Sequence, residues 1–146
     1  SSALKQSMKE GGVTEAIKYC NSAALPLTDE MSDTYQVIIK RTALRTRNDN
    51  NSPDKEELDI LNNYKKLLEK GAKIEPVVQL DHNNNPHFFA PIIMQKNCLT
   101  CHGRLDQDVS STTDSIIKSY YPNDIAMGFQ EDELRGIWSI TFLSEK

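Results

Sequence analysis

The chain has 146 residues, of which 38% are apolar and 26% charged, and its formal net charge at pH 7 is -4. This length suits one domain with a real core, while the acidic balance provides no basic surface for nucleic acid or an anionic membrane. No apolar run approaches the roughly eighteen residues of a transmembrane helix. The low apolar content is also consistent with a core to which a bound apolar group contributes.

The N-terminal part of the chain is predicted to be helical. Apolar residues recur at mostly helical spacing over residues 4–24, which predicts a helix over about 3–25. We expect a kink at Gly11-Gly12 and an end before Pro26. Cys20 lies on the apolar stripe, so it is predicted to face the interior, as buried structural cysteines commonly do.

Polar and basic residues follow this helix. Residues 28–34 are predicted to form a turn, and the apolar run 35–39 suits a strand or one helical turn. The basic stretch 40–47 precedes a loop over 48–52. Three arginines in that stretch form either a solvated face or a partner for carboxylates, which guanidinium forks bind well: Arg41, Arg45 and Arg47.

The middle of the chain changes from helical to extended character. A second helix is predicted from Ser52-Pro53, with Ser52 as its cap, to Gly71. Residues 76–80 and 87–90 are strand-like, and the polar residues 81–85 between them indicate a hairpin turn. The second strand leads directly into a cysteine-containing motif.

The C-terminal part is predicted to complete a small sheet. Thr112 or Thr113 caps a short helix, and residues 126–129 are expected to form a brief strand. Residues 134–143 alternate in character and give the clearest strand in the chain. Helices followed by a small antiparallel sheet predict an α+β fold.

The motif is formed by Cys98, Cys101 and His102 and has the pattern Cys-x-x-Cys-His, the attachment signature of a c-type haem. The two thiols form thioethers with the porphyrin vinyl groups, and the adjacent imidazole becomes the proximal iron ligand. Zinc would require a second pair of ligands. A thioredoxin-like dithiol would require a βαβ context and gives His102 no role. We therefore expect one covalent haem c, with zinc and a redox dithiol as the alternatives.

Other residues are candidates for the haem surroundings. Because a haem carries two propionates, the three arginines named above are candidate partners for them. The strand that leads into the motif is predicted to supply cavity residues from this set: Phe88, Phe89, Ile92 and Ile93. Two cysteines are used by the haem, so Cys20 is left as a lone thiol.

Several segments together carry a family resemblance: residues 16–20, 41–48, 51–53, 98–103, 121–128 and 135–136. From about Val13 to Phe142 the chain resembles the haem-c-binding, PAS-like sensor domains, a family long catalogued as a domain of unknown function. The resemblance implies a PAS-like antiparallel sheet with a long N-terminal helix and flanking helices. We expect one domain over residues 1–146, in which residues 1–12 extend the N-terminal helix. The chain departs from the family at Ala43, where serine is common, and it has no kinase or chemoreceptor module.

The resemblance also implies an unusual sixth iron ligand, a thiolate from the N-terminal helix, which falls on Cys20. The cysteine count points to the same residue. Rival ligands remain in the sequence: Met8, Met31, Met127, His82 and His87. Met94 is only four residues before Cys98, too close along the chain to reach the opposite haem face. A thiolate stabilises ferric iron and gives a low potential, whereas methionine raises the potential.

These features predict a low-potential redox or small-ligand sensor without catalytic residues, with a periplasmic electron-transfer cytochrome c as the alternative. A peroxidase-like enzyme would need His82 or His87 beside the iron, and nothing in the sequence places them there. Haem is attached to such motifs outside the bacterial cytoplasm, so we expect a periplasmic or other extracytoplasmic location and a removed signal or lipid anchor. The expected partners are a redox protein or a small gas, and an oligomer through the N-terminal helix is possible.

Overall fold

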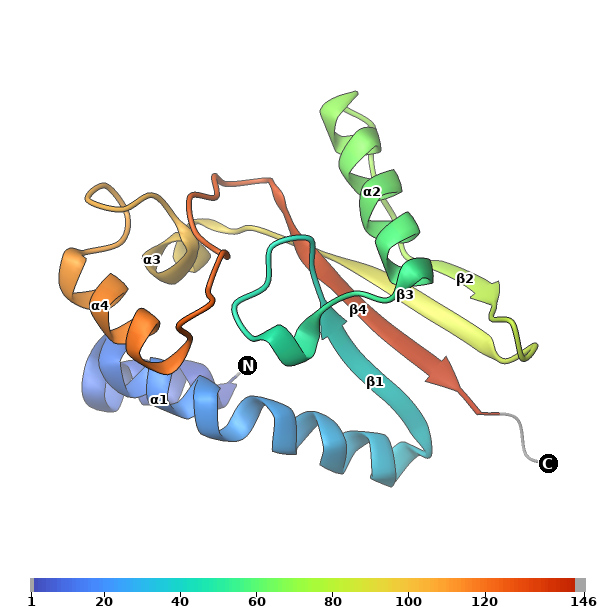
Figure 1. The fold of residues 1–146 in the computed structure, drawn as a ribbon, viewed down its shortest axis with the longest axis horizontal. Coiled ribbons are helices and arrows are strands. Elements are labelled where there is room, and N and C mark those ends of the chain that lie inside the picture. Colours follow the sequence, from blue (N-terminus) through green and yellow to red (C-terminus); the bar gives the residue numbers. More distant parts are fainter. Residues whose placement is uncertain (1, 144–146) are drawn as a thin grey trace.

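The computed structural model describes residues 2–143 and shows a four-stranded antiparallel sheet with helices around it (Figure 1). The strands are β1 Val37–Thr42, β2 Val77–Leu80, β3 Pro86–Ile93 and β4 Leu134–Phe142, in the spatial order β1-β4-β3-β2. The helices are α1 Ser2–Tyr35, α2 Lys55–Glu69, α3 Leu99–His102 and α4 Ser111–Tyr120, with 3-10 turns η1 Asp49–Asn51 and η2 Lys96–Cys98. The predicted α+β class is confirmed.

Helix α1 is longer than the sequence predicts. The expected kink is confirmed, because Gly12 adopts a φ of 67°, a left-handed value that favours glycine. The expected end before Pro26 is wrong, since the helix continues through this proline to Tyr35. Hydroxyls in the predicted turn bond to the helix itself, Thr28 donating to the carbonyl of Ala24 at 2.9 Å. No helix among residues 2–143 is long and apolar enough to cross a membrane.

Local hydrogen bonds set the starts of the other long helices. Asp54, not the predicted Ser52, caps α2, in a capping box in which Asp54 and Glu57 each accept the other's amide at 2.9 Å. Ser52 is used earlier, because its hydroxyl donates to the carbonyl of Asp49 and closes η1. Ser110 rather than a threonine caps α4.

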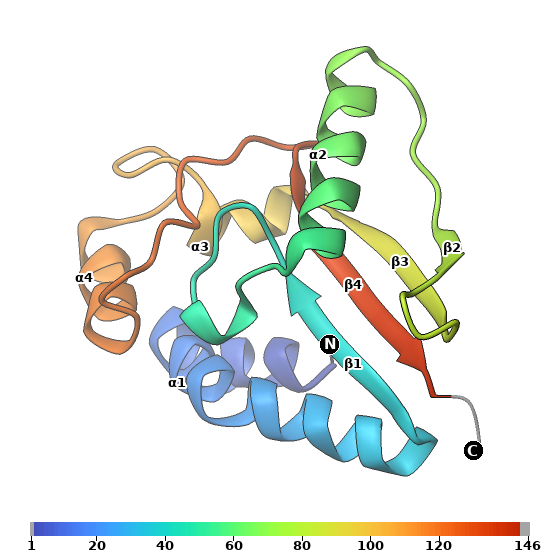
Figure 2. The same cartoon turned by 45° about the vertical axis from the view of Figure 1, so that its right-hand side comes forward.

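The pairing register divides the sheet into two faces. Arg41 and Ala90 both pair with Trp138, so these three side chains share one face, called here the Arg41 face. The opposite face, called the α2 face, carries the main core beneath α2: Leu61, Tyr64, Phe89 and Ile137. Figures 1 and 2 show α2 against the sheet, α3 and α4 at one end, and α1 running from α4 along the sheet to the start of β1.

A buried hydrogen-bond chain fastens α2 to the sheet. His87 Nε2 lies 2.7 Å from the Ser139 hydroxyl, and His87 Nδ1 lies 3.2 Å from a Glu56 carboxylate oxygen. The His87 ring also packs against the Phe89 ring, with the ring centroids 4.0 Å apart. These residue types occur together in hydrolase sites, but Ser139 is only 3% exposed, so its hydroxyl is closed to a substrate. These hydrogen bonds explain why a polar residue, Ser139, occupies an inward position of β4.

Candidate functional site

The Cys98–His102 motif forms a short helical stretch after β3. Cys98 and Cys101 are three residues apart, a spacing that places both side chains on the same side of a helical turn. Both thiols are half-buried and free of disulfides. Two adjacent thiols are thus available to one bound group.

His102 is held in one orientation by the main chain. Its Nδ1 lies 2.8 Å from the carbonyl oxygen of Ala126, and because a carbonyl only accepts, Nδ1 carries the proton. Burial keeps the pKa of His102 well below its usual value, and the positive charges of Arg47 and Arg135 add to this effect. The neutral ring therefore has its lone pair on Nε2, as in metal-binding histidines whose other nitrogen is hydrogen-bonded.

Residues 126–129 do not form the predicted strand and instead run as a loop beside α3. Two amides of this loop donate to the carbonyls of His102 and Gly103, at 2.9 and 2.8 Å. The extended segment thus pairs with the motif rather than with the sheet. This pairing places the Ala126 carbonyl within hydrogen-bond distance of the His102 ring.

A buried ion pair fixes this loop to the motif. The Arg47 guanidinium lies 3.2 Å from the Asp124 carboxylate, whose side chain is 2% exposed, and it donates to the Cys101 carbonyl at 2.6 Å. Asp124 also accepts the amide of Ala126 at 2.8 Å. The pair therefore holds both the motif and the carbonyl that orients His102.

Replacing Asp124 by asparagine is expected to lower the free energy of unfolding by about 3 kcal/mol, because Arg47 is left as a buried charge without a counter-ion. Urea unfolding followed by far-UV circular dichroism measures this. Glu15→Gln is the control, since Glu15 pairs with Lys18 at the surface with about half of each side chain exposed, and its effect should stay within about 0.5 kcal/mol. Equal stability of the two variants would contradict the role given to Asp124.

Cys20 lies on α1 close to the motif. Burial raises the pKa of its thiol, and the positive charges of Arg41 and Arg47 oppose that rise. A charge on Cys20 acts in turn on Cys101, and Cys101 packs against the apolar cluster that contains Ile17 of α1. The structure therefore brings the third cysteine to the same end of the molecule as the other two.

The three predicted arginines differ in how they are used. Within the described part of the chain Arg41 makes no hydrogen bond or ion pair, and it lies over the Trp138 ring at 5.1 Å from the centroid. Arg45 and Arg47 instead donate to backbone carbonyls of the motif and of the loop beside it. Arg41 is thus the arginine left with donors for a bound carboxylate.

The whole described chain, apart from its last residue, matches one family model, that of the Tll0287-like proteins, over residues 2–142. The chain belongs to the Tll0287-like family. Among solved structures, the crystal structure of the cyanobacterial heme-protein Tll0287 is similar to it, with a TM-score of 0.67 and 26% sequence identity. The similarity covers 80% of this chain and 67% of that one. No curated protein matches the chain.

In this Tll0287-like protein the predicted cavity residues divide between the two faces. Phe89 lies on the α2 face and is fully buried there, so it faces away from Arg41. The expectation that Phe89 lines the haem cavity is therefore corrected. Side chains alternate between the two faces along a strand, so Phe89 points to the face opposite to that of Phe88. Phe88 and Ile92 occupy the Arg41 face. Ile93 follows a bulge and is half-buried, and its contact with a bound group stays a prediction.

The rival axial ligands lie elsewhere or are engaged. His82 is in the exposed turn after β2, and His87 is buried beneath α2, so neither imidazole is at the motif. Met8 and Met31 are 37% and 44% exposed on α1. Met127 is beside the motif, but its sulfur accepts a hydrogen bond from Arg47 at 3.3 Å. Within residues 2–143 no three His, Cys, Asp or Glu side chains gather to hold a metal ion by themselves.

Some residues that shape the site were given no role from the sequence: Asp124, Ala126, Phe129 and Arg135. The Phe129 ring stands edge-on to the His102 ring, with centroids 6.3 Å apart and an interplanar angle of 88°. Most of these residues fall in segments that carry the family resemblance, which is the signal that marks them. Phe129 lies outside these segments, and the role of Ala126 cannot be inferred from its residue type, because every residue has a backbone carbonyl.

Proposed function

We propose that this Tll0287-like protein binds one haem c, held by thioethers from Cys98 and Cys101 and by His102 as axial ligand. The observation that carries the proposal is His102, whose Nδ1 is fixed on the Ala126 carbonyl so that Nε2 keeps its lone pair, in a motif that has two free thiols. The similar solved structure is that of a cyanobacterial heme-protein, which supports the same class of ligand.

The residues around the motif fit such a group in charge and polarity. Arg41 is a cation without a carboxylate partner among the described residues, and haem propionates are carboxylates that guanidinium forks suit. Trp138 and Ile92 share the Arg41 face and offer apolar surface to a porphyrin. Cys101 already packs in an apolar cluster.

Cys20 is proposed as the second axial ligand, through its thiolate. It lies at the same end of the molecule as the motif and is electrostatically coupled to both Arg41 and Cys101. The other sulfur near the motif, that of Met127, is engaged by Arg47. The donor set is then one imidazole and one thiolate, which favours ferric iron and a low potential.

A redox or small-ligand sensor is the function that this arrangement supports best. When bound, a haem supplies one-electron chemistry and a position for small axial ligands. Cys20 connects that chemistry to α1, whose residue Ile17 packs against Ile117 and Tyr121 of the neighbouring segment. Since α1 contacts α4 and β1, Cys20 as a ligand would connect a change at a bound haem to both elements, where a partner would detect it.

Electron transfer is the second candidate function. Cys98 and Cys101 are half-exposed, so the thioether edge of a haem would lie near the surface, where a partner protein exchanges electrons. Under either function we place the protein outside the bacterial cytoplasm, where haem attachment takes place. The partners proposed are a redox protein or a small gas, and a second copy bound through the N-terminal part of α1.

Reduction by dithionite in a stopped-flow spectrometer distinguishes the two functions. The sensor predicts that the thiolate signature disappears after reduction in a separate, slower step, and that carbon monoxide binds only after that step. The reason is that ferrous iron binds a thiolate more weakly than ferric iron does. Fast, reversible reduction with unchanged axial ligation and no carbon monoxide binding would favour the electron carrier.

A further inference from the structure

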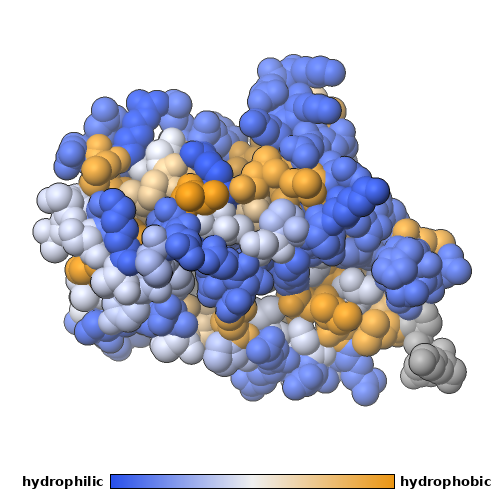
Figure 3. Space-filling view, viewed as in Figure 1, coloured by the Kyte–Doolittle hydropathy of each residue, from blue (hydrophilic) through white to orange (hydrophobic). Residues whose placement is uncertain are grey.

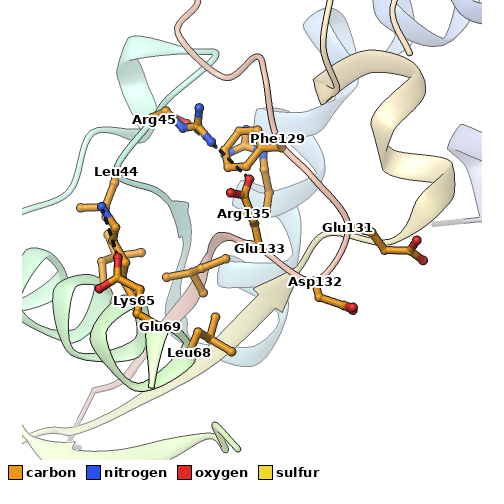
Figure 4. A pocket seen from close by; sticks show the side chains of 12 residues that line it. Leu44, Arg45, Lys65, Leu68, Glu69, Phe129, Glu131, Asp132, Glu133 and Arg135 are labelled. Carbon is orange, nitrogen blue, oxygen red and sulfur yellow. Dashed lines mark hydrogen bonds and ion pairs between the residues drawn. The ribbon is translucent and has the colours of Figure 1, made fainter. Parts of the chain in front are cut away.

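A second site lies next to the motif, in a cleft between α2 and the segment that leads into β4. Its volume is about 580 Å³, within the range of small-molecule sites. One wall is apolar and is built mainly by these residues: Leu44, Leu68 and Leu134. The facing wall is formed by Phe129 between Arg45 and Arg135 (Figure 4). Figure 3 shows apolar surface beside α2 bordered by hydrophilic residues.

The charges that line this cleft are mostly paired. Glu133 pairs with Arg45 at 3.8 Å, and Glu69 pairs with Lys65 at 4.0 Å. Two further acidic residues, Glu131 and Asp132, turn their carboxylates away from the leucines, as Figure 4 shows. The paired charges cancel, and Glu131 and Asp132 are exposed to solvent, so Arg135 is the remaining lining charge that is partly buried.

Arg135 lacks the partner that a buried guanidinium normally has. Its Nη1 donates to the carbonyl of Arg45 at 3.1 Å, and its Nε is buried without an acceptor. Burial lowers the pKa of Arg135 to about 10, and the nearby charges of Arg41 and Arg47 contribute to the shift. Within residues 2–143 no carboxylate forms an ion pair with it. An anion that enters the cleft would supply the missing charge.

We propose that this cleft binds a small organic monocarboxylate with an apolar body. The carboxylate meets the Arg135 guanidinium from its Nη2 side, because Nε is buried and Nη1 already donates to the Arg45 carbonyl. The apolar body lies against the leucine wall and the Phe129 ring. Hydrophobic contact and one charge-assisted interaction together suit a ligand of this small size.

The cleft is also connected to His102. Phe129 lines the cleft, stands edge-on to the His102 imidazole, and donates its amide to the His102 carbonyl at 2.9 Å. A ligand that moves the Phe129 ring therefore moves a direct neighbour of the proposed axial ligand. The cleft is thus a regulatory site for the haem, and this second half of the inference rests on the proposed function.

Binding is tested with hexanoate, using hexanol as the uncharged probe, by NMR titration of the whole protein. We expect hexanoate to bind with a dissociation constant of about 1 mM, a normal value for so few atoms, and hexanol about tenfold more weakly. Arg135→Gln and, separately, Leu68→Glu should each weaken hexanoate binding about tenfold or more. Arg104→Gln, an exposed arginine outside the cleft, is the matched control and should bind as the wild type does. Equal binding of hexanoate and hexanol, or undiminished binding by both cleft variants, overturns the site.

The connection to His102 has its own readout in the haem-loaded protein. Hexanoate should shift the electron paramagnetic resonance g-values of the ferric protein with the same concentration dependence as the NMR titration. Binding without any spectral change overturns the regulatory half of the inference. Protein that matures without haem would refute the proposed function, while the NMR titration would still decide whether the cleft binds a carboxylate.

Discussion

Replacing Cys98 and Cys101 together by serine is expected to abolish covalent haem attachment. The wild-type protein, matured in a host that attaches haem, should keep its haem after denaturation and extraction with acidified acetone, because thioether bonds survive unfolding. The double variant should lose nearly all of it, since hydroxyls do not form the thioethers and only axial coordination remains. Haem-stained denaturing gels and the mass of the intact chain measure the difference.

Cys20→Ser is the matched control for this experiment, because it also removes a thiol at the same end of the molecule but leaves the motif intact. Its haem should remain covalently bound. If the double variant retained covalent haem, or if the control lost it, the assignment of the two attachment cysteines would be wrong.

Cys20→Ser is itself expected to change the iron strongly. Loss of the thiolate removes the electron donation that stabilises the ferric state, so the midpoint potential should rise by about 100 mV or more, where about 59 mV is a tenfold change for a one-electron couple. The ferric protein should also lose its low-spin thiolate spectrum. Spectroelectrochemical titration measures both effects.

Met127→Leu provides the comparison for Cys20, because Met127 is the other sulfur next to the motif and Arg47 already engages it. This variant should keep the wild-type spectrum, with a potential within about 30 mV of the wild-type value. A wild-type spectrum in Cys20→Ser together with an altered one in Met127→Leu would transfer the ligand role to the methionine.

Much of the fold follows from local patterns in the sequence. The alternation over residues 134–143 predicts β4, and the polar turn between two apolar runs predicts the β2–β3 hairpin. The extent of α1 does not follow, because Pro26 ordinarily ends a helix. Here the rest of the helix is stabilised by contact with β1, where Ser32 accepts the amide of Ile39 at 3.0 Å. Such long-range compensation is invisible to a local pattern.

The candidate site also contains residues that the sequence predicts and residues that only the structure reveals. The spacing of Cys98, Cys101 and His102 specifies its own chemistry, so the sequence is sufficient to propose the attachment residues. The assignment of Phe89 failed because the α2 face and the Arg41 face are both apolar. Only the position of α2 decides which face is closed by the protein itself. The unpaired Arg135 likewise becomes apparent only when the partners of its neighbours are known.

The measurement that tests the central claim most directly is the absorption and electron paramagnetic resonance spectrum of the wild-type protein, oxidised and then reduced with dithionite. A covalent haem held by His102 and Cys20 predicts a low-spin ferric thiolate signature that disappears on reduction. A charge-transfer band of methionine-ligated iron, or the absence of any haem signal from protein matured in a haem-attaching host, would contradict the account.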